Sequence, residues 1–222
     1  MREFNLLGEY PRPEKPRYVG SDLRTINHRI VATYRDKDFF DGNRNYGYGG
    51  FKYDGRWKIF LKKIIKRYNL NKNSKVLDIS AKKGFFMHDL TLLLPGIKVY
   101  GVEDHKYPIM NSMKSVRNNI KFLNSFCDMN YKKDHFDFVH AHNAIYRYSF
   151  KDLIKIIRII SKISKKSHIT IPAYDNNKER LKFYDWTLHG GVLLKKNEWK
   201  QLFNEIGYNG DYYFSGTKSF GI

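Results

Sequence analysis

Short apolar runs, separated by longer mixed segments, constrain the fold of this chain more than any other feature. From Lys75 onward the sequence contains five such runs: "KVLDIS", "IKVYGVE", "IKFLNS", "FDFVHAH" and "SHITIPAY". Each is separated from the next by enough residues for a helix or a loop. This pattern is typical of parallel strands joined by crossover connections. We therefore expect an α/β fold.

Two other segments have the periodicity of amphipathic helices. "WKIFLKKIIKRYNL" and "SFKDLIKIIRIISKISKK" place apolar residues three and four positions apart, and lysines occupy the opposite face of the second. We expect both helices to pack on the core and the lysine face to be solvated. A basic helix that reads nucleic acid is the alternative.

The length of 222 residues, 41% of them hydrophobic, suffices for one main domain. We expect an N-terminal arm over 1–38, a tyrosine- and glycine-rich cap segment with a helix over 39–74, and a core over 75–222. In the arm, the prolines of "YPRPEKPRY" favour an extended backbone. The stretch "SDLRTINHRIVATYRDKDFF" that follows is interpreted as a short helix.

The formal net charge is +19. A surface this basic attracts nucleic acid, anionic membranes or phosphorylated small molecules. Because lysine outnumbers arginine and Asn and Ile are abundant, the bias of an AT-rich genome is an alternative explanation. The composition alone does not decide between a polyanionic partner and such a bias.

Cysteine and hydropathy patterns predict an intracellular protein. Cys127 is the single cysteine, which excludes an intrachain disulfide and a zinc site made of several thiolates. No segment approaches the roughly 20 apolar residues that span a bilayer. The N-terminal stretch carries acidic residues and prolines where a signal peptide has an apolar run. We expect a soluble, cytoplasmic protein, monomeric or homodimeric.

The stretch "KVLDISAKKGFF", Lys75 to Phe86, has the layout of a strand, a turn and a helix start. In open parallel sheets this turn is the usual ligand cradle. A dinucleotide fingerprint needs three glycines and only Gly84 is present, which argues against NAD. S-adenosylmethionine has no phosphate and carries an ammonium and a sulfonium, so the acidic Asp78 suits it. Glu103, at the end of the next strand, is placed to accept hydrogen bonds from the ribose hydroxyls.

The sequence resembles the class I S-adenosylmethionine-dependent methyltransferases from about Phe39 to Phe214. "VLDISAKKGFF" looks like their first motif and "VYGVED" like their second-strand acidic motif. The resemblance implies a Rossmann-like, mostly parallel seven-stranded sheet with helices on both faces, here with an N-terminal extension. It also implies S-adenosylmethionine as the cofactor.

The same resemblance implies the cofactor contacts. "LNSFCDMNYKKDHFDFVHAHNAIYR" is similar to the family stretch that holds an adenine-contacting turn and the fourth strand. On that alignment Cys127 and Asp128 would lie near the adenine, and His140 and Ala141 beside the transferred methyl. The cofactor-binding set implied by the family is Asp78, Ser80, Ala81, Gly84, Glu103, Cys127, Asp128 and Ala141.

A closer resemblance is to a bacterial branch of this superfamily. Its members carry a segment like "NYGYGGFKYDGRW" before the core and a tail like "EWKQLFNEIGYNGDYY" after it. The branch is thought to act on small molecules, often in gene settings concerned with sugars. This chain departs from the family motif because Ser80 and Ala81 replace a glycine and a cysteine, and Lys82 joins Lys83 beside a site for a cationic cofactor.

Two histidines are the candidate catalytic residues. His140 and His142 alternate along the end of a strand and so face the same side. A neutral histidine suits the role of general base for an alcohol acceptor near pH 7. A metal site with Asp137 and simple packing within the strand are the alternatives, and we predict no bound metal.

Aromatic and basic residues outside the core motifs are the candidate acceptor contacts. Tyr46, Tyr48 and Lys52 would belong to a lid, with glycines as hinges. The alternative is that these aromatics only attach the N-terminal segment to the sheet. Tyr174 and Trp186, with His189, follow the fifth strand and would line the acceptor pocket, although such residues are also common in cores.

Three functions are compatible with these observations. The first is methyl transfer from S-adenosylmethionine to an oxygen or nitrogen of a small molecule, such as a sugar or a phosphorylated metabolite. An anionic acceptor would give Lys52, Arg56 and Arg147 a role near the pocket. The second is an RNA methyltransferase, because aromatic and basic residues interleave in "RNYGYGGFKYDGRWK". The third is a catalytically inactive binding protein on a methyltransferase-like core.

Overall fold

The computed structural model describes residues 1–6 and 17–222, and its centre is a seven-stranded sheet. The strands are β1 (Lys75–Ile79), β2 (Lys98–Glu103), β3 (Ile120–Phe122), β4 (Phe138–His142), β5 (Ser167–Tyr174), β6 (Leu194–Lys195) and β7 (Asp211–Ser215). Their order is β3-β2-β1-β4-β5, and both β6 and β7 pair with β5. Among the described residues all six strand pairings are parallel. The predicted α/β fold with a mostly parallel seven-stranded sheet is confirmed.

The helices connect the strands as crossovers or lie outside the sheet. They are α1 (Ile26–Thr33), α2 (Lys37–Asp41), α3 (Trp57–Tyr68), α4 (Phe85–Leu93), α5 (Lys106–Met110), α6 (Phe150–Ile163), α7 (Asn177–Trp186), α8 (Lys196–Glu205) and α9 (Thr217–Phe220). Three short 3₁₀ turns are η1 (Arg117–Asn119), η2 (Phe126–Asp128) and η3 (Ile145–Arg147). None of the described helices is long and apolar enough to cross a membrane.

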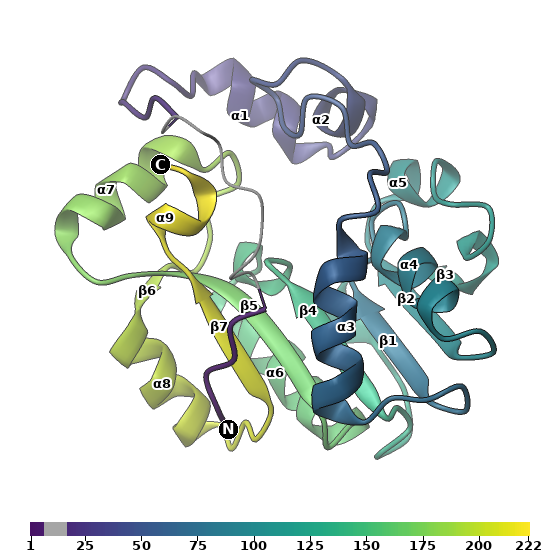
Figure 1. Cartoon of the computed structure of the whole chain (residues 1–222). Helices are drawn as coiled ribbons and strands as arrows, with labels where there is room; N and C mark the ends of the chain where they lie inside the picture. Colours follow the sequence, from purple (N-terminus) through teal and green to yellow (C-terminus); the bar gives the residue numbers. More distant parts are fainter. Residues whose placement is uncertain (7–16) are drawn as a thin grey trace.

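Helices cover both faces of the sheet, as predicted (Figure 1). On one face α6 and α8 bury their apolar residues against Leu77, Val139 and Ile169. The predicted apolar stripe of α6 is entirely buried, which confirms its assignment. On the other face α3 and α4 pack against Val76 and Phe138. Burial of these apolar surfaces is the main contribution to stability.

The N-terminal residues add to this second face. The Phe4 amide donates a 2.7 Å hydrogen bond to the Tyr212 carbonyl of β7, and the Tyr212 amide donates a 3.0 Å bond to the Arg2 carbonyl. Leu6 is fully buried in the core beneath α3 and α4. The predicted extended segment from Tyr10 to Tyr18 lies mostly outside the described residues.

Residues 17–56, a range different from the cap segment predicted over 39–74, are called the cap from here on; they contain α1 and α2 and lie across the top of the sheet in Figure 1. The single helix expected between Ser21 and Phe40 is instead two helices, because Arg35 between them has a left-handed φ of +46°. Phe39 and Phe40 of α2 are buried and pack against Tyr48 and Phe51 of the following loop. The cap therefore has an aromatic core of its own.

Candidate functional site

A cavity of about 470 Å³ lies between the cap and the carboxyl ends of the strands. Ser80 and Lys82 after β1, His142 and Asn143 at the end of β4, and Ser215 of β7 line its floor. From β1 the strand order continues to β2 and β3, and from β4 it continues to β5. The cavity therefore lies at the point where the strand order reverses, which is where ligands bind in open α/β sheets. A second hollow beside Trp186 and Phe220 holds only about 20 Å³.

The turn that follows β1 has an unusual backbone. Ser80, Lys82 and Gly84 have φ values of +62°, +53° and +74°, which place all three in the left-handed region. A side chain at Gly84 would come within 2.8 Å of the Val116 side chain, so glycine is required there by both conformation and space. Ser80 and Lys82 adopt the same region at a cost that glycine would not have.

Asp78 and Glu103, two of the three carboxylates expected at the cofactor, lie on the α3/α4 side of the sheet and are both buried. Asp78 Oδ1 is 3.0 Å from His140 Nδ1. Burial raises the pKa of Asp78, and the bond to His140 opposes this shift. Glu103 is fully buried and accepts hydrogen bonds from the Lys82 amide at 2.9 Å, the Ser80 hydroxyl at 3.2 Å and the Asp104 amide at 3.0 Å. The protein's own donors therefore occupy both carboxylates.

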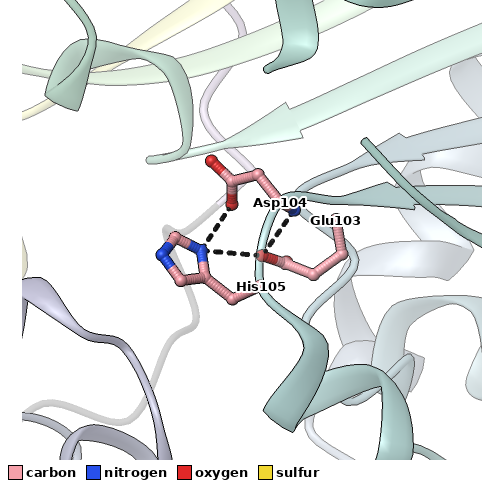
Figure 2. A group of neighbouring side chains, drawn as sticks. All are labelled: Glu103, Asp104 and His105. Carbon is pink, nitrogen blue, oxygen red and sulfur yellow. Dashed lines mark hydrogen bonds and ion pairs between the residues drawn. The ribbon is translucent and has the colours of Figure 1, made fainter. Parts of the chain in front are cut away.

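Figure 2 shows the neighbouring group of Glu103, Asp104 and His105 after β2. His105 Nδ1 lies 2.8 Å from Asp104 Oδ1 and 3.7 Å from Glu103 Oε1. The other Asp104 oxygen pairs with Arg147 and accepts a 2.7 Å bond from the Tyr148 hydroxyl. Burial opposes these charges, but the two carboxylates raise the pKa of His105, and His105 and Arg147 lower the pKa of Asp104. Among the described residues this group is an ion-pair network in which His105 and Arg147 are paired with Asp104.

Six of the residues predicted for the site line the cavity: Tyr48, Lys52, Ser80, His142, Trp186 and His189. The others are outside its lining: Tyr46, Asp78, Ala81, Gly84, Glu103, Cys127, Asp128, His140, Ala141 and Tyr174. Tyr174, expected at the acceptor pocket, is instead buried against Phe183 and Ile222. Arg56 and Arg147, expected near an anionic acceptor, do line the cavity.

Cys127 and Asp128, expected near the adenine, lie in the 3₁₀ turn η2, and both make hydrogen bonds within the protein. Asp128 Oδ2 accepts a 3.2 Å bond from the Ser125 amide, and Cys127 Sγ lies 3.7 Å from the Asp152 carbonyl. Phe126 between them is fully buried, and the Arg147 guanidinium lies 5.4 Å from its ring centre. Asp128 is therefore bonded within its own turn, and the Cys127 thiol is directed at a backbone carbonyl of α6.

The two candidate catalytic histidines have different environments. His140 is fully buried, stacks on Phe86 with ring centres 4.2 Å apart and is bonded to Asp78, so it does not reach the cavity. His142 lines the cavity, and its Nδ1 has no hydrogen-bond partner among the described residues. Burial, helped by the charges of Lys82 and His140, holds the pKa of His142 well below its usual value. His142 is therefore a neutral hydrogen-bond acceptor at pH 7.

The charge of the cavity lining is strongly positive. Its basic residues are Arg17, Arg24, Arg35, Arg44, Lys52, Arg56, Lys82 and Arg147. Among the described residues Asp54 is the single carboxylate in that lining, and it pairs with Arg56. Burial and the nearby arginines lower the pKa of both Arg24 and Arg44. The sequence interpretation did not identify Arg24, Arg35 and Arg44, because only the fold of the cap brings these separate positions to one wall.

No protein-family model and no curated protein matches this sequence. Solved structures do match. A candidate methyltransferase of Bacillus halodurans C-125 superposes with a TM-score of 0.52 at 15% identity over 66% of this chain and 68% of that one. The YcgJ protein of Bacillus subtilis gives 0.51 at 19% identity over 66% of each chain. A candidate sarcosine dimethylglycine methyltransferase of Galdieria sulphuraria gives 0.51 at 15% identity over 68% of this chain and 61% of that one.

These likenesses cover about two thirds of the chain, and at this level of identity they establish architecture. They agree with the parallel strand order and with helices on both faces of the sheet. The chain therefore shares the Rossmann-like α/β fold of these solved structures, two of which are candidate methyltransferases.

Proposed function

We propose that this protein transfers a methyl group from S-adenosylmethionine to an oxygen or nitrogen of a small anionic molecule. The observation that carries the proposal is the cavity of about 470 Å³ at the reversal of strand order, between β1 and β4. A cavity of this size is in the range that encloses small ligands. The methyltransferase-like fold gives the proposal its reaction class, as an argument by analogy.

An unpaired amide oxygen at the floor of the cavity supports binding of the amino acid half of the cofactor. Asn143 Oδ1 is buried and has no hydrogen-bond partner among the described residues, and it can accept from an ammonium. Lys82, which also lines the cavity, supplies a cation for the cofactor carboxylate. The residues present therefore fit this half.

The ribose half fits after one side chain turns. Glu103 is the acceptor suited to the ribose hydroxyls, and the Ser80 hydroxyl now donates to it. Ser80 itself lines the cavity, so rotation of its side chain would exchange a protein hydroxyl for a ligand hydroxyl at the same carboxylate. We infer that Glu103 and Asn143 hold the cofactor once the Ser80 hydroxyl has turned away from Glu103.

The bound cofactor would supply an electrophilic methyl group on a sulfonium. The protein's part is then to align the acceptor and to exclude water. Phe39, Tyr48, Phe51 and Trp57 give the cavity an aromatic lining that suits exclusion of water. His142, neutral at pH 7, would accept a hydrogen bond from the hydroxyl or amine that is methylated.

The excess of basic residues supports an anionic acceptor, such as a phosphorylated sugar or another phosphorylated metabolite. Positive walls raise the local concentration of anions and speed their association. S-adenosylmethionine carries a net positive charge, so it does not account for this wall. The acceptor must then supply the negative charge.

Isothermal titration with S-adenosylmethionine and S-adenosylhomocysteine tests the proposal. We expect saturable binding, and Asn143→Gly should weaken it about tenfold, since one hydrogen bond to a charged group contributes roughly 1.5 kcal/mol. Glycine suits the φ of +46° at this position, so the variant should remain folded. The control is Asn204→Gly, at an exposed position of α8. Absence of heat with folded protein at millimolar ligand would overturn the proposal.

A further inference from the structure

Arg35 is a buried cation that has no counter-ion among the described residues. Its side chain lines the cavity, yet the residue is only 6% exposed. Within residues 1–6 and 17–222 its guanidinium has no carboxylate in ion-pair range and no hydrogen-bond acceptor, and its buried Nε has no partner. An isolated buried charge costs several kcal/mol unless another group compensates it.

The cap holds this guanidinium in place by aromatic contacts. Its central carbon lies 4.9 Å from the ring centre of Phe39 and 5.7 Å from that of Phe40, both buried in α2. Contact with ring faces leaves the N–H groups along the edge of the guanidinium free to donate. The backbone of Arg35 is also fixed in the left-handed region between two helices. The side chain is therefore positioned before any ligand arrives.

None of the described groups around Arg35 neutralises its positive charge. His189, also in the cavity lining, has a pKa lowered to about 3, mainly by burial and then by the charges of Arg35 and Arg147. Arg147 already pairs with Asp104. Arg24 and Arg44 line the same cavity and donate to backbone carbonyls of Trp186, Asn45 and Gly47, which carry no net charge. No described carboxylate in the lining is available to Arg35.

We propose that Arg35 is the centre of a phosphate subsite in the cavity and binds a phosphoryl group of the acceptor. A phosphate dianion accepts two parallel hydrogen bonds from the guanidinium edge and compensates more charge than a carboxylate does. The wall with Arg24 and Arg44 matches such a dianion. That the ligand is the methyl acceptor rests on the proposed function, whereas the anion site itself stands on the buried charge.

Thermal unfolding of the full chain at constant ionic strength tests the subsite. We expect inorganic phosphate and glucose 6-phosphate to raise the melting temperature more than chloride or glucose does. Arg35→Gln should abolish this rise. Without phosphate the variant should melt no lower than the unmodified protein, because it lacks the uncompensated charge. The control Arg158→Gln, on the exposed face of α6, should keep the full response.

Arg35→Lys keeps the charge but loses the planar fork, so its affinity for phosphate should fall about tenfold. This variant decides the question if Arg35→Gln does not fold, as judged by circular dichroism. Equal responses to phosphate and chloride in the unmodified protein, or an unchanged response in both variants, would overturn the subsite. A titration of the same samples with S-adenosylhomocysteine tests the proposed function separately, because Arg35 is not among the residues assigned to the cofactor.

Discussion

At the scale of single residues, Ser80 shapes the floor of the cavity. Its φ of +62° suits glycine, and its hydroxyl donates to the buried carboxylate of Glu103 at 3.2 Å. The left-handed conformation costs a residue with a side chain roughly 1 kcal/mol. The hydrogen bond to a charged acceptor offsets that cost. Ser80 thus covers Glu103 with a hydroxyl of the protein itself.

Two substitutions of Ser80 separate the effect of its left-handed backbone from the effect of its hydrogen bond to Glu103. Ser80→Ala keeps the left-handed strain and loses the hydrogen bond, so the free energy of unfolding should fall by about 1 kcal/mol. In Ser80→Gly the strain is relieved as well, and the stability should be close to that of the unmodified protein. Both variants expose Glu103 and should bind S-adenosylhomocysteine more tightly, as titration calorimetry would measure. Affinities equal to the unmodified protein would show that Ser80 does not compete with the ribose.

At the scale of elements, the cap is fixed to the core on two sides of the cavity. On one side Arg24 and Arg29 donate to carbonyls at the end of α7, at Trp186, Thr187 and Tyr184. Cations are favourable there because the last carbonyls of a helix lack partners within the helix. On the other side Asp41 of α2 binds Lys83 and Tyr107, each at 2.7 Å.

Replacing Asp41 tests whether this second attachment holds the cap. In Asp41→Asn the largely buried Lys83 loses its counter-ion, and we expect the free energy of unfolding to fall by roughly 2 kcal/mol. Hydrogen exchange of the α2 amides should also become faster.

Asp54→Asn is the matched control for Asp41→Asn within the cap. The side chains of Asp54 and Arg56 are 43% and 45% exposed, so the loss of their pair should cost less than about 0.5 kcal/mol. Equal effects of the two substitutions would show that Asp41 has no special part in holding the cap.

At the scale of the whole molecule, neutral histidines are built into the interior. His168 is fully buried on β5 and its Nε2 lies 2.9 Å from the Phe4 carbonyl, which connects the N-terminal residues to the sheet. Burial lowers the pKa of His168 to about 3. The pKa of His189 is also about 3, and that of His142 is well below its usual value, again mainly through burial.

These shifts give the stability a pH dependence with a defined sign. Because the folded pKa lies below the unfolded value of about 6.5, the unfolded chain binds more protons in acid. The contribution to stability is present above that value and is lost as the pH falls toward 3. Between about pH 6.5 and 3, His168 and His189 should each lower the free energy of unfolding by about 1.4 kcal/mol for every unit that the pH falls. Urea unfolding of His168→Gln should show a smaller slope, and an unchanged slope would contradict the shift.

The sheet was largely predictable because strand-forming patterns are local. Each of the five apolar runs became a strand, and the apolar stripe of α6 became its buried face. The apolar runs did not predict β6 and β7. β6 has only two residues, and β7 is recognisable only from its pairing with β5. The break at Arg35 was also missed, since its left-handed backbone depends on how α1 and α2 pack.

The sequence predicted where the candidate site lies better than it predicted which residues form it. The strand ends at β1 and β4 indicated Ser80 and His142, and both line the cavity, because carboxyl ends of parallel strands meet at one edge. The sequence could not show that Asp78 and Glu103 are bonded to neighbours of their own chain, nor that the cap collects a wall of arginines. The apolar periodicity of the sequence by itself determined the α/β architecture, because burial of alternating patterns depends on near neighbours. Tertiary structure alone decided which polar groups are free, because partners distant in sequence supply or withhold their hydrogen bonds and counter-ions.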